Sequence, residues 1–353
     1  MRDFWQEPVL ELQAEADALN HELNGDRVSY VINRNVNFTN VCTVGCKFCG
    51  FGVASTDSRA YFLEAADVVA KVAQTPWVTE VCLQGGIPRQ LTFEYYLQLV
   101  EAIHAAFPEI HIHAFSPMEI FHMHQVSGQG YEDILRQLKD RGLSSIPGTA
   151  AEILVDEVRE VVSGNKLTSD QWEAIVRTAH RAGIPSTATM MFGHIETEKH
   201  IELHLERLRN IQLDTGGFTE FVPLAFIPYD NRLGRQLARS NDDMTFTKLD
   251  ERTMNLAERI YPMSRLYFQE WIPNLQTSWV KLGRETAVES LAWGCNDFGG
   301  TLYEESITKS SGGAHGEVLH PEEITELVAQ TGKTAIQRNT LYSRLGQNQP
   351  VAV

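Results

Sequence analysis

The amino-acid sequence predicts an α/β fold, a TIM-type (βα)8 barrel with an N-terminal helical extension. Short apolar runs that favour β-strands recur along the chain, and a longer stretch with helical periodicity follows each of them. This alternation is typical of parallel βα units, and about eight such units, the number that closes a barrel, are present. The chain has no internal repeat and no obvious linker, so one domain is favoured over two.

The extension is expected over residues 1–27, because its sequence indicates a polar amphipathic helix. The barrel with its C-terminal helices is expected over residues 28–346, followed by a flexible tail over residues 347–353. The N-terminal stretch lacks the basic start and apolar core of a secretion signal. No apolar run approaches the ~20 residues that span a bilayer, so no membrane association is expected.

Strands and helices alternate in the predicted order. The strands are expected near residues 28–38, 79–83, 111–115, 144–146, 186–192, 217–223, 265–271 and 291–296. The helices between them are expected at residues 64–74, 93–107, 131–141, 169–182, 199–211, 250–261 and 279–289. Thr, Ser or Asp precedes several of these helices as an N-cap residue, and Pro321 is expected to begin a last helix.

Composition narrows the class of function. The chain has 46 acidic and 30 basic residues, which gives a formal net charge of -16. This charge repels polyanions, so no nucleic-acid partner is expected. Three of the five cysteines lie within eight residues, unlike the spread of an extracellular disulfide framework. A cytoplasmic location is therefore expected.

Cys42, Cys46 and Cys49 are the strongest candidates for chemistry. They follow the first predicted strand, and in a parallel barrel the loops after the strands converge on one face. A structural zinc site and a ferredoxin cluster each take four protein ligands, whereas this loop supplies three thiols. Three thiolates on a [4Fe–4S] cluster leave one iron open to chelate a cofactor. Buried or zinc-binding cysteines are the competing interpretation, but clustered loop thiols beside Lys47 and glycines make poor core residues.

The spacing CxxxCxxC, with the aromatic Phe48 directly before the last cysteine, resembles the motif of the radical S-adenosylmethionine (SAM) superfamily. The resemblance implies a [4Fe–4S] cluster held by Cys42, Cys46 and Cys49, with S-adenosyl-L-methionine bound at the open iron. Cys82 and Cys295 fall in other predicted strands, and each is expected to be a small buried hydrophobic residue instead.

Glycines after the second predicted strand are candidates for cofactor binding. Gly85 and Gly86 let the backbone approach a ligand, and superfamily members often carry a Gly-Gly-Glu segment there that holds the methionine amino group. Ile87 stands where that Glu would be, so contact through backbone carbonyls or Gln84 is expected. An ordinary β-turn is the alternative.

Two further segments are candidates for the same cofactor. Thr149 and Glu152 lie where the fourth predicted strand leads into a helix, whose N–H groups suit a carboxylate or a ribose hydroxyl. A helix-start carboxylate without a ligand is the alternative for Glu152. Thr189 and His194 lie in and after the fifth predicted strand and are expected to line the adenosine, with core packing as the alternative for that strand.

A series of motifs resembles one subgroup of the superfamily over most of the chain. The series comprises Asn35-Val-Asn37-Phe-Thr-Asn40-Val-Cys42, Leu83-Gln84-Gly85-Gly86, His113-Ala-Phe-Ser116-Pro117-Met-Glu119, residues 147–154, Gly216-Gly-Phe-Thr-Glu220-Phe-Val-Pro223 and Asn296-Asp297-Phe-Gly299-Gly300-Thr301. The subgroup contains the CofH-type 4-hydroxyphenyl transferase subunit of 7,8-didemethyl-8-hydroxy-5-deazariboflavin synthase and the aminofutalosine-pathway enzymes of menaquinone biosynthesis. Residues 148–152 and 337–340 resemble the transferase version.

The resemblance implies the coupling of L-tyrosine to 5-amino-6-(D-ribitylamino)uracil in deazaflavin (coenzyme F0) biosynthesis. An external low-potential reductant would supply the electron that cleaves SAM to a 5′-deoxyadenosyl radical. That radical would lead to cleavage of the tyrosine Cα–Cβ bond, and the resulting 4-hydroxybenzyl radical would add to C5 of the uracil. A deazaflavin synthase subunit that closes the ring is a candidate second partner.

Polar residues near the expected barrel mouth are the candidates for substrate contact. Asn296 and Asp297 have the mixed donor and acceptor character that suits uracil edges or ribityl hydroxyls, with helix capping by Asp297 as the alternative. Glu119 and His113 are expected to orient the tyrosine ammonium or phenol, directly or through a neighbour. Glu220 belongs to the same group.

Other functions compete with this interpretation. An aminofutalosine synthase or a dehypoxanthine futalosine cyclase would keep the cofactors and change the substrate. An iron–sulfur electron-transfer or sensor protein would carry a cluster without cleaving SAM, and a zinc-dependent hydrolase would hold zinc. The barrel-like alternation and the unfilled fourth thiol position argue against the electron-transfer protein.

Overall fold

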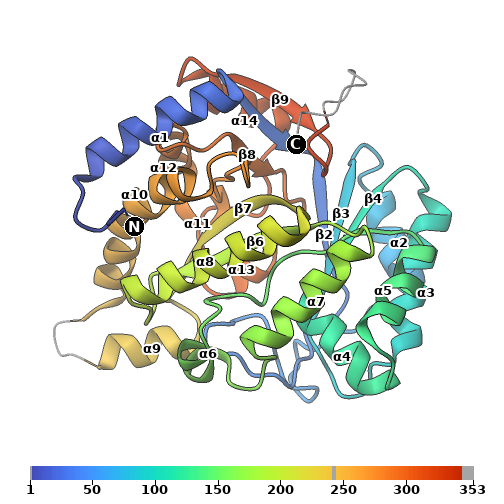
Figure 1. Ribbon diagram of the computed structural model, residues 1–353. Coiled ribbons are helices and arrows are strands. Elements are labelled where there is room, and N and C mark those ends of the chain that lie inside the picture. The colour runs from blue at the N-terminus through green and yellow to red at the C-terminus, as the bar shows by residue number, and fades with distance from the viewer. Residues whose placement is uncertain (1, 241–243, 344–353) are drawn as a thin grey trace.

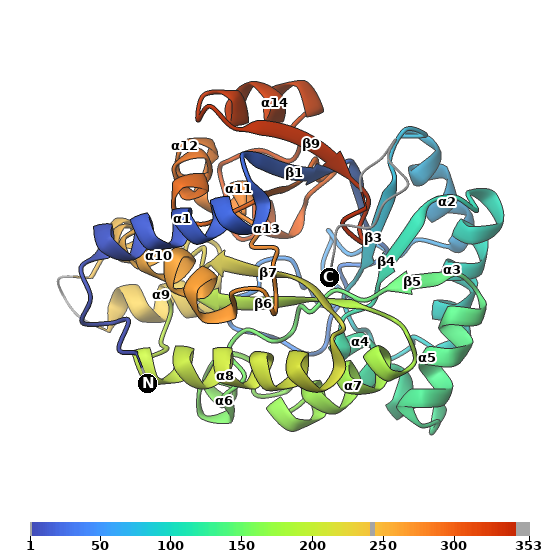
Figure 2. The same ribbon diagram turned by 45° about the horizontal axis from the view of Figure 1, so that its top comes forward.

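A parallel barrel forms the centre of the computed structural model, which describes residues 2–240 and 244–343 (Figures 1 and 2). In spatial order its strands are β1 (Arg27–Val31) and β2 (Asn33–Asn37), β3 (Glu80–Gln84), β4 (His111–Ala114), β5 (Leu143–Ser145), β6 (Ser186–Phe192), β7 (Phe218–Ala225) and β8 (Asp297–Gly300). Parallel bridges Ile146–Ser186, Phe221–Leu275 and Gln276–Asp297 join the separate sheets, and β8 pairs with β1 to close the ring. The α/β barrel predicted from the alternation is therefore confirmed.

The first predicted strand is divided at Ile32, because its two halves have different neighbours. The half before Ile32, β1, pairs with β9 (Thr334–Arg338), a strand that the sequence analysis does not predict. The half after it, β2, pairs with β3. The register places Arg338 beside Val31, so the end of β9 reaches the middle of the barrel.

Helices surround this ring. They are α1 (Val9–Asn24), α2 (Ala65–Ala73), α3 (Phe93–Ala106), α4 (Pro117–Ser127), α5 (Tyr131–Asp140), α6 (Asp156–Ser163), α7 (Ser169–Arg181), α8 (Glu198–Thr215), α9 (Arg232–Arg239), α10 (Phe246–Phe268), α11 (Trp279–Leu282), α12 (Arg284–Glu289), α13 (Ile307–Ser310) and α14 (Pro321–Ala329). Thr92, Thr168, Thr197 and Thr245 each accept a hydrogen bond from a backbone N–H in the first turn, as N-cap residues do. No helix in the described parts of the chain has the length and apolar character needed to cross a membrane.

The strand predicted at residues 265–271 is wrong, because α10 continues through most of that stretch. Its apolar residues pack inward from a helix, and Phe268 lies against Phe221 of β7 with ring centroids 4.9 Å apart. Periodicity alone does not separate a short buried strand from a buried helical turn. Leu275 and Gln276 take the strand position in the ring instead.

The strand predicted at residues 291–296 and the helix predicted at residues 279–289 also need correction. A single 3-10 turn (Ser290–Ala292) and Gly294, with φ +98°, form a bend, so β8 begins only at Asp297. Gly283, with φ +85°, divides the predicted helix into α11 and α12. Both glycines adopt the left-handed region that favours glycine and ends regular structure.

The N-terminal extension packs on the outside of the barrel. Leu12 and Ala16 of α1 are fully buried and form a small apolar cluster with Leu266 of α10. We retain as a proposal the division into an extension over residues 1–27, a barrel over residues 28–346 and a tail over residues 347–353. The tail lies outside the described residues.

Candidate active site

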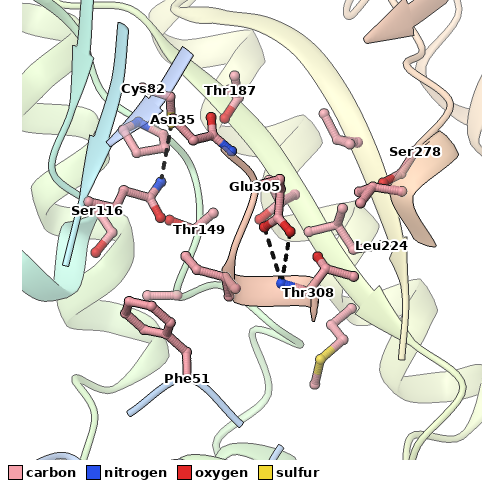
Figure 3. A pocket seen from close by; sticks show the side chains of 18 of the residues that line it. Asn35, Phe51, Cys82, Ser116, Thr149, Thr187, Leu224, Ser278, Glu305 and Thr308 are labelled. Atoms are coloured by element: carbon pink, nitrogen blue, oxygen red, sulfur yellow. Dashed lines mark hydrogen bonds between the residues drawn. The ribbon is translucent and has the colours of Figure 1, made fainter. Parts of the chain in front are cut away.

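A cavity of about 430 Å³ runs from the middle of the barrel to the loops that follow its strands (Figure 3). Figure 3 shows Asn35, Ser116 and Thr149 on one side of this space and Leu224 and Ser278 on the other. Most residues predicted for the site line the cavity: Cys42, Cys46, Cys49, Gln84, Gly85, Gly86, His113, Glu119, Thr149, Glu152, Thr189 and Glu220. The barrel thus gathers residues from loops that are far apart in the sequence.

The loop at residues 42–51 presents its three thiols to the cavity. A Cβ added to Gly52 would lie 3.9 Å from Cys42 Sγ and 4.0 Å from Cys49 Sγ, so these two sulfurs face the same point. Gly45 has φ +72°, a conformation that glycine adopts without a steric cost, and it lets the chain turn between the first two cysteines. The sequence spacing therefore folds into a single concave loop.

Neighbouring segments hold this loop by its backbone. The N–H of Thr43 donates to Ile87 O at 3.0 Å, in the loop after β3. The N–H of Lys47 donates to Val162 O of α6 at 2.8 Å. These anchors come from two different βα units, so the position of the thiols is fixed by the barrel and not by the loop alone.

Two lysines from distant parts of the chain line the same cavity as the thiols. Burial raises the pKa of the Cys46 thiol to about 12, and the positive charge of Lys166 opposes that shift. Burial lowers the pKa of Lys166, but Cys46 and Glu152 outweigh it and the net shift is upward. Burial also lowers the pKa of Lys281, and Cys49 is among the groups that oppose the change. Lysine charges beside thiols favour the thiolate, which is the form that binds metal.

This donor set fits a cluster better than a single ion. Among residues 2–240 and 244–343, no three His, Cys, Asp or Glu side chains converge as the ligands of one metal ion do. In a [4Fe–4S] cluster each thiolate binds a different iron, so its sulfurs need not converge on one point. Three soft thiolates beside two cations suit an anionic cluster with one iron free of protein ligands.

Glu119 holds the loop after β3 that contains Gly85 and Gly86. Its Oε1 accepts a hydrogen bond from the Gly85 N–H at 3.1 Å, and its Oε2 accepts from the N–H and the hydroxyl of Ser116 at 2.6 and 2.8 Å. Burial raises the pKa of Glu119 to about 7, against the effect of these hydrogen bonds. A Cβ on Gly86 would lie 2.2 Å from Val41 O, so the close approach of this loop to the cysteine loop requires glycine.

Three buried polar atoms on the cavity wall lack a hydrogen-bond partner within the described residues: Asn35 Oδ1, Thr149 Oγ1 and Glu152 Oε2. Glu152 Oε1 accepts from Lys166 Nζ at 2.7 Å, whereas its Oε2 has only the Arg159 guanidinium at 3.5 Å. Buried polar groups are normally hydrogen-bonded. The three atoms therefore mark places where the donors or acceptors of a bound ligand would fit.

The opposite end of the cavity, its floor, is a buried cluster of charges around Arg338. The Arg338 guanidinium donates to both oxygens of Asp297 at 2.5 and 3.0 Å and to Glu220 Oε2 at 3.1 Å, and the Tyr342 hydroxyl donates to the same oxygen. Burial raises the pKa of Glu220 to about 7, although Arg338 opposes the shift. Asp297 is fully buried and does not line the cavity. This corrects the prediction of substrate contact for Asp297, whose carboxylate instead holds Arg338 at the cavity surface.

His194 and Asn296 also lie away from the cavity, which corrects the prediction that they contact a ligand. The His194 ring is buried, and its Nε2 shares a hydrogen bond with Met191 O at 3.0 Å. The Asn296 Oδ1 accepts from the Arg265 guanidinium at 2.7 Å and from the Leu275 N–H at 2.8 Å. The polar groups of Asn296 thus hold the barrel wall, whereas the Nδ1 of His194 has no hydrogen-bond partner among the described residues and lies 3.1 Å from Glu196 Oε2.

His113 and Thr189 line the cavity, and each has a polar atom that already has a partner. His113 Nδ1 and Ser145 Oγ are 2.6 Å apart, and the Thr189 hydroxyl donates to Gly148 O at 2.7 Å. Burial lowers the pKa of His113, although Glu80 opposes the shift, so the imidazole is neutral near pH 7. The Thr189 hydroxyl therefore uses its proton within the wall, whereas His113 Nε2 has no hydrogen-bond partner among the described residues and can serve a ligand.

Five charged residues of the site are missed by sequence reasoning: Glu80, Lys166, Lys281, Glu305 and Arg338. Glu80 lies in the strand predicted at residues 79–83 and begins β3, and a carboxylate inside an otherwise apolar barrel strand is a signal that could have identified it. Arg338 lies in the segment that resembles the transferases. Nothing in the local sequence around Lys166 or Lys281 distinguishes them from surface lysines.

The chain is similar to known proteins over most of its length. Residues 36–208 match the Radical SAM superfamily, and residues 215–350 match the CofH/MqnC C-terminal region. The chain is 45% identical over 320 residues to the 5-amino-6-(D-ribitylamino)uracil--L-tyrosine 4-hydroxyphenyl transferase of Methanopyrus kandleri, covering 90% of this chain and 84% of the relative. It is 44% identical over 334 residues to the protein of the same name from Archaeoglobus fulgidus, covering 94% and 92%. The crystal structure of methylornithine synthase has a similar fold, with a TM-score of 0.66 at 14% identity over 95% of this chain and 90% of that one.

Proposed function

The chain belongs to the radical SAM superfamily and to the family of the 5-amino-6-(D-ribitylamino)uracil--L-tyrosine 4-hydroxyphenyl transferases, and from this premise we propose that it transfers the 4-hydroxybenzyl group of L-tyrosine to 5-amino-6-(D-ribitylamino)uracil. As a member of the superfamily it uses a [4Fe–4S] cluster and SAM. The matched C-terminal region is shared by CofH and MqnC, but the relatives at 44% and 45% identity carry the transferase name. That name supports the transferase over the menaquinone-pathway enzymes.

We assign the cluster to Cys42, Cys46 and Cys49, with Lys166 and Lys281 balancing its negative charge. When bound, the cluster and SAM supply the 5′-deoxyadenosyl radical that begins the reaction. The glycine pair with Gln84, and the partnerless atoms of Asn35, Thr149 and Glu152, are the groups assigned to SAM. Gly86 and Glu152 are buried, the other four residues are half-buried, and all of them lie on strands or loops of the barrel, so they orient the cofactor before reaction.

The floor around Arg338 and Glu220 is assigned to the diaminouracil. Ribityl hydroxyls and uracil edges need donors and acceptors together, and this ion pair offers both at the cavity surface. Apolar side chains, including Met118, Leu224 and Phe226, supply a wall for the tyrosine ring. Enclosure of both substrates in one cavity keeps water and other hydrogen donors from the reacting atoms.

The proposal includes partners and a location. An external low-potential reductant must supply electrons, and a deazaflavin synthase subunit that closes the ring is the candidate recipient of the product. We place the reaction in the cytoplasm, because three of the five cysteines are assigned to the cluster and the other two are not joined by a disulfide, as in a reducing compartment.

The observation that carries the proposal is the single cavity that joins three thiols to the polar floor, in a chain so similar to the named transferases. The test is to reconstitute the cluster without oxygen and to supply dithionite, SAM and either tyrosine with the diaminouracil or the menaquinone precursors. We expect a coupled adduct and 5′-deoxyadenosine from the tyrosine pair only. Turnover of a menaquinone precursor without any tyrosine adduct would refute the assignment.

A further inference from the structure

Helix α9, at the lower left of Figure 1, has an unusually basic exposed face. Arg232, Arg235 and Arg239 are exposed at helical spacing, and with Gln236 and Ser240 they line a shallow hollow of about 500 Å³. We call these five residues the basic face. The helix contains no acidic residue, in a chain whose formal net charge is -16.

The basic face is attached to the cysteine loop. The Arg232 guanidinium donates to Gly45 O at 2.6 Å, and the Leu233 N–H donates to Lys47 O at 2.8 Å. The two accepting carbonyls belong to the residues on either side of Cys46. Helix α9 therefore holds the outer side of the loop whose thiols face the cavity, and a molecule seated on the basic face would lie against that loop.

Among the described residues, only Cys42, Cys46 and Cys49 lie close enough together in sequence to hold a cluster. Cys82 lies on β3 at the cavity wall, and Cys295 is fully buried in the core. Electrons for the site must therefore come from another molecule. A large carrier cannot enter a cavity of about 430 Å³, so it must approach the outside of the loop.

We propose that the basic face is the docking site of a small acidic one-electron carrier protein, an inference that rests on the proposed function. In the transfer, the reduced carrier loses one electron and the cluster gains it, and no proton or atom moves. Within residues 2–240 and 244–343, no carboxylate forms an ion pair with the three arginines, so no described residue neutralises their charge; Asp242 and Asp243, which follow in the sequence, lie outside the described residues. Opposite charges of this kind steer association and fix orientation. A nucleic acid is a poor alternative occupant, because the rest of the chain is strongly acidic.

The test replaces two arginines that do not touch the cysteine loop, in the variant Arg235→Glu/Arg239→Glu. Binding of an oxidised, acidic ferredoxin to the reconstituted protein is measured by calorimetry at low and physiological salt. We expect Kd to rise about tenfold or more in the variant, with a weaker dependence on salt. The matched control is Arg27→Glu/Arg136→Glu, which makes the same change in net charge on β1 and α5, and it should bind like the wild type.

Turnover provides a second measurement. Dithionite is too small to need docking, so dithionite-driven turnover should be equal in the wild type and in Arg235→Glu/Arg239→Glu, whereas ferredoxin-driven turnover should fall in the variant. The proposal is overturned if the variant binds ferredoxin as tightly as the wild type, or if the control weakens binding equally. Binding that depends on these arginines in a protein that makes no tyrosine adduct would refute the proposed function and still support the docking site.

Discussion

Gly85 donates its backbone N–H to Glu119 Oε1 at 3.1 Å, and this hydrogen bond joins the loop after β3 to the first turn of α4. The glycine pair is followed by Ile87 and has no carboxylate of its own in sequence. The next βα unit supplies a carboxylate, that of Glu119, which lies beside the glycine pair. The carboxylate is buried, and burial raises its pKa to about 7.

The raised pKa of Glu119 predicts a pH effect on stability. The folded state holds the carboxyl proton up to pH about 7, whereas the unfolded chain loses it near pH 4.3. Stability from this group therefore falls as pH rises from about 4.3 to 7, by a few kcal/mol at most. Urea unfolding of the cluster-free protein at several pH values should show a smaller fall in Glu119→Gln than in the wild type, the fall that remains coming from Glu220, whose pKa burial also raises to about 7. Parallel pH profiles for the two proteins would contradict the prediction.

Arg338→Lys tests the assignment of the cavity floor. The substitution keeps the charge but loses the forked contacts with Glu220 and Asp297, so we expect a stability loss of about 1–3 kcal/mol. KM for the diaminouracil should rise on the order of tenfold, while KM for tyrosine changes less. Arg265→Lys is the matched control, since Arg265 is equally buried and lies outside the cavity. It should lose stability without changing either KM, and an unchanged KM in Arg338→Lys would refute the assignment.

Lys166 and Lys281 are predicted to stabilise the reduced cluster. Reduction adds negative charge, so removing a neighbouring positive charge favours the oxidised form. Lys166→Met and Lys281→Met should each lower the midpoint potential in an anaerobic redox titration, and the exposed Lys139→Met should not. Midpoint potentials equal to that of the wild type would show that the charges of these lysines do not stabilise the reduced cluster.

The two cysteines outside the loop are predicted to differ from the three within it. Cys295→Ala removes a fully buried thiol and should cost about 1–3 kcal/mol of stability while the cluster still assembles. Cys82→Ala should behave similarly, with a smaller cost because Cys82 is only partly buried. Cys46→Ala should abolish turnover. Retained activity in Cys46→Ala would count against the mechanism.

The fold follows from the sequence where the hydrophobic pattern is strong. The strand at residues 186–192 is predicted with its observed bounds, and Thr168 caps the next helix upstream as its residue type suggests. The errors lie where a short apolar stretch could form either a buried strand or a buried turn of a helix. The last turn of α10 around Phe268 has the composition of a strand, but contacts with Phe221 favour the helix. Strand β9 is missed because its pairing with β1 spans nearly the whole chain.

The part of the site that local sequence motifs form is predictable, and the part that long-range contacts form is not. The cysteine loop and the residues of the Gly85 loop are local motifs, and both line the cavity. Asp297 is predicted to follow the end of a strand over residues 291–296, but it begins β8, and its side chain pairs with Arg338, which arrives from β9. Lys166 reaches Glu152 across the turn that follows α6, a contact that no spacing in the sequence reveals. Long-range ion pairs of this kind require the fold.

The central claim is that Cys42, Cys46 and Cys49 hold a cluster whose fourth iron is left open for SAM. The most direct measurement is the electron paramagnetic resonance spectrum of the reduced, reconstituted protein before and after addition of SAM. We predict a [4Fe–4S] signal that changes when SAM is added and that is absent from Cys46→Ala. A signal that SAM leaves unchanged, with no 5′-deoxyadenosine formed, would contradict the account.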